Sequence, residues 1–190
     1  MSLAVDDYRR RGDTDALTTA LATLAERATP GELAAAAAPY RDLPEVVAPL
    51  YERIVARGAG GAAADAQAAV VLGNAYWLLG RGADAVGALA SRALGIDPTN
   101  RGAWHLWALS EPDLRARVAR WQQVAARFPG DALARALLAD NAASLAGAEH
   151  DPLALALAIE TYEALRPAAR HPDQRAALDR ALDTLRSWRL

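Results

Sequence analysis

Apolar residues recur along most of the chain at steps of three and four, which is the spacing of one face of an α-helix. Residues 16–24 and 46–54 show the pattern most clearly. The apolar positions are Ala16, Leu17, Ala20, Leu21 and Leu24 in the first segment, and Val46, Val47, Leu50, Tyr51 and Ile54 in the second. No segment has the convincing two-residue alternation of a strand. The pattern therefore predicts an all-α protein.

Helix start and stop signals separate these segments. Thr29, Pro30 and Glu32 have the spacing of a capping box with proline at the first helical position. Gly58 is expected to end the helix that contains residues 46–54. Further helix starts are predicted at Asp13 or Thr14, at Ser110-Glu111-Pro112-Asp113 and at Asp151-Pro152. The chain thus reads as a succession of helices joined by short connections.

One segment carries a recognisable motif. Residues 72–76 read Leu-Gly-Asn-Ala-Tyr, and the next predicted helix holds Ala85, Leu89 and Ala93 before Pro98. This arrangement resembles the tetratricopeptide repeat (TPR) family, in which a Leu-Gly-x-x-Tyr helix packs against a helix with small, large and small residues. The second helix is one residue longer here than in the family pattern. The resemblance implies that Gly73 lets the two helices approach closely.

The motif recurs along the chain in a weaker form. Trp107 follows Leu72 by 35 positions, and Leu138 follows Trp107 by 31. These intervals bracket the family's repeat length of about 34 residues. Prolines that end successive units stand at positions 98, 129 and 172, and the last interval of 43 indicates an insertion around 147–152 or 167–171.

The resemblance implies a right-handed α–α superhelix, a solenoid of antiparallel helix pairs, formed by about ten or eleven helices. We expect one helical-repeat domain over residues 1–190. Within it, residues 13–58 are divergent N-terminal repeats and residues 62–141 are the best TPR-like repeats. Residues 151–190 are expected to form a divergent repeat and a C-terminal capping helix.

In TPR proteins one side of the first helix of each repeat lines a concave groove that binds peptides. Positions three and four residues apart on the first helix of each predicted repeat identify the corresponding side here. Ala136 lies on this side, between Leu133 and Asp140. The predicted partner-binding residues are Gln67, Val70, Asn74, Trp77, His105, Leu109, Leu133 and Asp140. Asn74 and Gln67 can hydrogen-bond an extended backbone.

Four of the five tryptophans fall into two groups. Trp104, Trp107 and Trp121 stand where the repeat needs bulk between helices, and they are predicted to lie in the core. Trp77 leaves two hypotheses open: it is an anchor for an apolar side chain of the partner, or it packs against the preceding repeat.

Composition excludes several classes of chemistry. The chain has no cysteine and all 21 of its basic residues are arginine, so it cannot form a thiolate metal cluster, a Walker lysine site or a lysine Schiff base. A net charge of -2 argues against a nucleic-acid surface. The three histidines, at 105, 150 and 171, lack metal-ligand spacing, and the five serines lack a G-x-S-x-G context. We therefore predict no catalytic residue, metal site or cofactor.

The start of the chain has charges, Asp6, Asp7 and three arginines, where a signal peptide would need an apolar region, and the uncharged stretch 66–80 is too short and too polar to span a bilayer. A cytoplasmic protein without a membrane partner is expected.

The predicted function is that of a non-catalytic adaptor that binds a protein or peptide segment in the groove. The alternative is an all-helical enzyme or small-molecule binder with a site near Trp77 and His105. A chaperone-tail clamp is not favoured, because His105, Leu133 and Asp140 replace the basic residues that such a clamp uses in this family. A homo-oligomer stays possible.

Overall fold

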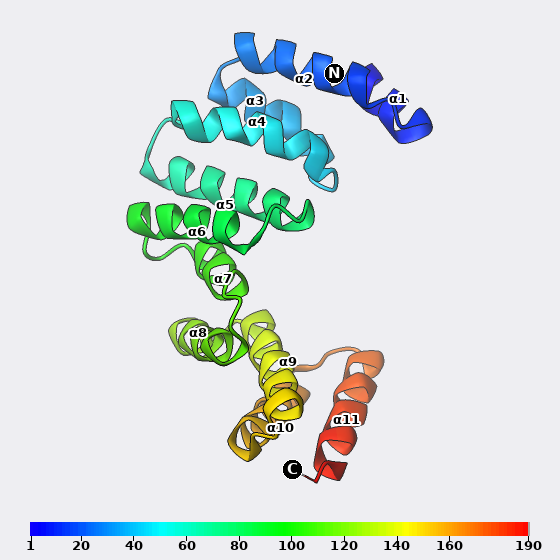
Figure 1. Ribbon diagram of the computed structural model, residues 1–190, viewed down its shortest axis with the longest axis vertical. Coiled ribbons are helices and arrows are strands. Elements are labelled where there is room, and N and C mark those ends of the chain that lie inside the picture. The colour runs from blue at the N-terminus through cyan, green and yellow to red at the C-terminus, as the bar shows by residue number, and fades with distance from the viewer. Residues whose placement is uncertain (190) are drawn as a thin grey trace. The chain divides into compact units, whose positions relative to one another are not determined.

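The computed structural model describes residues 1–189, and these residues form helices and no strand (Figure 1). The all-α prediction is therefore confirmed. The α-helices are α1 (Ser2–Arg11), α2 (Thr14–Arg27), α3 (Pro30–Ala37), α4 (Pro44–Arg57), α5 (Ala62–Leu78), α6 (Ala83–Ile96), α7 (Arg101–Leu109), α8 (Leu114–Arg127), α9 (Ala132–Glu149), α10 (Pro152–Leu165) and α11 (Pro172–Ser187). Two short 3-10 helices are present, η1 (Ala38–Tyr40) and η2 (Arg166–Ala168). Within the described residues, no helix combines the length and the apolar character that crossing a membrane requires.

The chain divides into two compact units, and the boundary between Trp107 and Ala108 falls within α7. In the first unit, neighbouring helices pack in sequence: α1 against α2, α3 against α4, α4 against α5, and α5 against α6, with α2 also on α4. In the second unit, α8 packs against α9, α9 against α10, and α10 against α11. Each unit thus consists of helices that pack against their neighbours in the chain.

The predicted caps form at several helix starts. Thr29 and Glu32 make both bonds of the capping box at the start of α3. The carboxylates of Asp13, Asp113 and Asp151 accept hydrogen bonds from backbone N–H groups in the first turns of α2, α8 and α10. Such bonds satisfy N–H groups that have no partner inside the helix. Local sequence therefore explains where these helices begin.

Pro39 lies at the start of the connection between α3 and α4. The proline lies in η1, directly after α3 ends at Ala37, and its ring cannot continue the helical hydrogen-bond pattern. The chain then passes through Arg41 and Asp42 and enters α4 at Pro44. This turn brings Arg41 to the side of α4 that faces α5.

Helix α5 is buried on two sides. On one side Val70 belongs to a cluster with residues of α6 and α7, including Val86 and Leu106. On another side Leu72 packs with Val47 of α4. Only a narrow strip of α5 between these contacts is left to line a groove.

Candidate functional site

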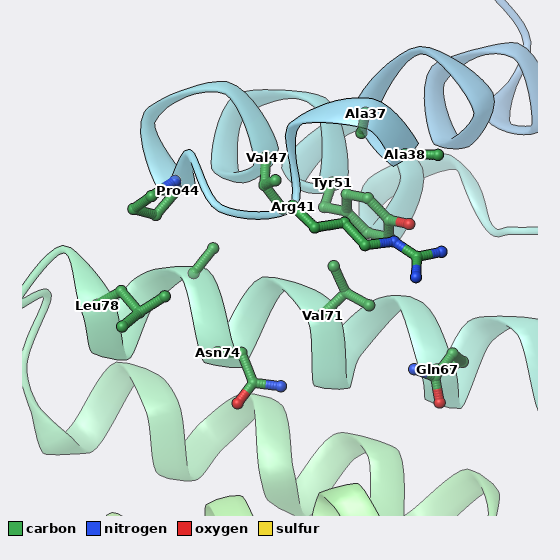
Figure 2. A pocket seen from close by; sticks show the side chains of 11 residues that line it. Ala37, Ala38, Arg41, Pro44, Val47, Tyr51, Gln67, Val71, Asn74 and Leu78 are labelled. Carbon is green, nitrogen blue, oxygen red and sulfur yellow. The ribbon is translucent and has the colours of Figure 1, made fainter.

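A groove in the first unit lies between α5 and the α3–α4 segment, and we call it the α5 groove (Figure 2). Its volume is about 330 Å³. The residues that line it are Ala37, Ala38, Arg41, Pro44, Val47, Tyr51, Gln67, Val71, Asn74, Ala75 and Leu78.

The floor of the α5 groove is largely apolar. Figure 2 shows Val47 and Tyr51 on the α4 side and Val71 on the α5 side, with Leu78 near one end. Val47 is buried and Val71 is half-buried. The groove can therefore accept apolar side chains of a ligand.

A polar contact outside the groove connects its two walls. The Tyr76 hydroxyl on α5 donates a hydrogen bond to Oε1 of Glu52 on α4, at 2.9 Å. Burial raises the pKa of Tyr76. The Glu52 carboxylate raises this pKa further, because it accepts a hydrogen bond from the hydroxyl group and its negative charge repels a phenolate. The guanidinium of Arg81 lies 5.1 Å from the centre of the Tyr76 ring. The hydrogen bond between Tyr76 and Glu52 links α5 to α4 beside the groove.

Three polar side chains of the groove are available to a ligand. Arg41, Gln67 and Asn74 are exposed, and within residues 1–189 their side chains make no hydrogen bond or ion pair. Each carboxamide offers both a donor and an acceptor, whereas the guanidinium offers donors and one positive charge. The groove lining can therefore hydrogen-bond a polypeptide backbone and attract one anionic group.

The structure brings together two of the predicted partner-binding residues, Gln67 and Asn74, and leaves Val70 and Trp77 off the groove. Each residue of an α-helix turns about 100° around the helix axis. Measured from Gln67 in the same direction of rotation, Asn74 lies about 20° away, Val70 about 60° and Trp77 about 80°. Val70 is only 4% exposed and faces Gly102 of α7, whereas Trp77 is 44% exposed.

The remaining predicted residues lie on α7 and α9. His105 and Leu109 are half-buried on α7, and the chain divides into its two units between them. Leu133 is 58% exposed on α9. Asp140 accepts a hydrogen bond from the Tyr162 hydroxyl, and burial together with this carboxylate raises the pKa of Tyr162.

Asp140 and Tyr162 also line a second groove, which lies between α9 and α11 in the second unit and has a volume of about 570 Å³. Much of its lining is alanine, and Ala136 is part of it. Among residues 1–189, no group of three or more His, Cys, Asp or Glu side chains is placed to hold a metal ion.

Sequence reasoning missed the α4 wall of the α5 groove. Arg41 and Tyr51 carry no local signal that places them opposite α5, because their position depends on packing between helices. The positions of Val71 and Leu78 in the groove lining could have been predicted from the sequence. They complete, with Gln67 and Asn74, a four-three-four spacing that marks one narrow helix face.

We predict that Trp77→Ala changes the free energy of unfolding by no more than about 1 kcal/mol, because nearly half of the side chain is already in water. Urea denaturation followed by circular dichroism measures the change. A loss of about 3 kcal/mol or more would instead show that Trp77 packs in the core of the preceding repeat.

Comparison with protein-family models found no match to this chain, and comparison with curated proteins found none either. The resemblance to TPR proteins therefore depends on the motif residues and their spacing.

Proposed function

We propose that the protein is a non-catalytic adaptor of the TPR type, a right-handed superhelix of antiparallel helix pairs that binds an extended segment of another polypeptide in the α5 groove. The observation that carries this proposal is the pair of carboxamides, Gln67 and Asn74, which share one face of α5 and have no hydrogen-bond partner within the described residues. The proposal places this adaptor in the cytoplasm.

The spacing of the two carboxamides suits an extended chain. Gln67 and Asn74 are seven residues apart, which corresponds to about 10.5 Å along the helix axis. An extended polypeptide advances about 3.3 Å per residue, so the two carboxamides span about three of its residues. Carboxamides can bond the N–H and C=O groups that an extended chain leaves unpaired.

The apolar part of the groove supports the same ligand. Figure 2 shows the Val71 side chain on α5, between the positions of Gln67 and Asn74, pointing toward Val47 and Tyr51 of the α4 wall, and it shows the two carboxamides on the other edge of α5. A chain that bonds both carboxamides along this edge can turn an intervening side chain over α5 toward Val71 and the α4 wall. Burial of that side chain adds affinity at about 25 cal/mol per Å² of apolar surface removed from water.

The proposal is tested by selection from a library of random peptides displayed between two constant flanking segments, with the full chain as bait. We expect peptides to be enriched, and we expect the double variant Gln67→Ala/Asn74→Ala to bind them about tenfold more weakly. Two lost hydrogen bonds at about 0.5–1.5 kcal/mol each account for this change.

The matched control is Gln122→Ala/Gln123→Ala, which removes two exposed carboxamides from α8. This control should bind the peptides as the wild-type protein does. Failure to enrich any peptide from this library and from a second library with free carboxyl ends, or equal binding by the wild-type protein and the Gln67→Ala/Asn74→Ala variant, would contradict the proposed function.

A further inference from the structure

Among residues 1–189, Arg41 is the only charged residue that lines the α5 groove. Figure 2 shows its guanidinium between the α4 wall and α5, over the stretch that includes Val71. The arginine is exposed and makes no ion pair within residues 1–189. The neighbouring Asp42, in contrast, already forms an ion pair with Arg9. The groove therefore has one positive charge without a counter-charge.

This charge matches a ligand that carries one negative charge. A carboxylate accepts two parallel hydrogen bonds from a guanidinium, a geometry that gives both affinity and specificity. A phosphorylated side chain carries about -1.5 to -2 charges, which a single arginine does not balance. The charge of the groove therefore favours a carboxylate over a phosphate.

The position of Arg41 favours a side-chain carboxylate over a chain end. In Figure 2 the guanidinium lies on the α4 side of α5, between the positions of Gln67 and Asn74 and closer to Gln67, and the two carboxamides lie on the other edge of α5. A segment that bonds both carboxamides continues past Arg41 in both directions. Its own backbone then occupies the positions on either side of the guanidinium, and the carboxylate must come from a side chain.

We infer that the α5 groove selects an extended partner segment with an Asp or Glu side chain, and that Arg41 binds its carboxylate. This inference rests on the proposed function, whose peptide ligand it specifies. The contact lies on an exposed part of the groove, so added salt weakens it.

The test repeats the library selection with the full-length wild-type chain, with Arg41→Gln and with Arg11→Gln as the matched control. Arg11 is an exposed arginine of α1 outside the groove, so its variant has the same change in charge. We expect the wild-type chain and Arg11→Gln to enrich Asp or Glu at one position of the selected peptides. Arg41→Gln should enrich peptides without this preference.

A selected peptide with blocked ends then gives the strength of the contact. Replacing its acidic residue with the corresponding amide should weaken binding to the wild-type chain about tenfold and binding to Arg41→Gln less than about twofold, as expected for two groups in direct contact. Equal losses for both proteins would overturn the assignment of Arg41.

The other outcomes separate this inference from the proposed function. Peptides that lack an acidic preference, yet bind the Gln67→Ala/Asn74→Ala variant more weakly, would overturn the inference and leave the proposed function standing. Enrichment only from a second library with free carboxyl ends would show that the groove binds a chain terminus, which overturns the side-chain assignment. No enrichment from either library would overturn both.

Discussion

Replacing Trp121 with alanine should lower the free energy of unfolding by about 3–5 kcal/mol, the largest effect that we expect from a single substitution in this protein. Trp121 lies on α8 in the second unit, and only 1% of its surface is exposed. Its removal takes away the burial of a large aromatic ring and leaves a cavity that its neighbours fill only in part. The change is a large fraction of the 5–15 kcal/mol that stabilises a typical domain.

Urea denaturation of the full chain, followed by circular dichroism, measures this loss. The control is Leu153→Ala on α10, in the same unit, because Leu153 is 81% exposed and its truncation should change stability by less than about 0.5 kcal/mol. If Trp121→Ala and Leu153→Ala had similar small effects, the placement of Trp121 in the core would be wrong.

Gly73→Leu should destabilise the first unit by about 1–3 kcal/mol. A Cβ added at Gly73 would lie 2.7 Å from Cδ1 of Leu106 and 3.7 Å from Cβ of Leu89. The end of the Leu106 side chain can move to accept a single methyl group, but a leucine adds three more carbons to the same narrow space. Overpacking then outweighs the gain of about 1 kcal/mol from replacing a helical glycine.

Gly95→Leu provides the matched control for Gly73→Leu. Gly95 also lies within a helix, α6, but a Cβ added there meets no described atom within 4 Å. This variant should be neutral or slightly more stable than the wild-type protein, because it gains helix propensity without a clash. Thermal melts of both variants distinguish the two sites. Equal melting temperatures would show that the contact between Gly73 and Leu106 is not tight.

Much of the helical structure could be predicted because its signals are local. The capping box of Thr29 and Glu32 and the N-cap carboxylate of Asp113 act within four residues of their own position in the chain. Of the three tryptophans predicted to lie in the core, Trp121 is buried, whereas Trp104 and Trp107 are half-buried on α7.

The candidate site could be predicted only in part. Gln67 and Asn74 could be predicted because they lie on one face of α5. The steps of three that add Val70 and Trp77 place them about 60° and 80° around the helix from Gln67 and so off the groove. Because α5 is apolar over most of its surface, its sequence gives little guidance on which side packs against α4 and which against α7. Arg41 depends on the turn at Pro39 and on the packing of α4 against α5.

The central claim is that the α5 groove holds a polypeptide through Gln67 and Asn74. The most direct test is a ¹⁵N NMR titration of the full chain with a peptide from the library selection, observed at the side-chain NH₂ groups. The chain has three asparagines and four glutamines, so the spectrum is simple and each signal can be assigned by single substitution. We predict that the signals of Gln67 and Asn74 move on titration while the other five stay in place. Movement of Gln174, which lines the groove between α9 and α11, without movement of Gln67 and Asn74 would contradict the claim.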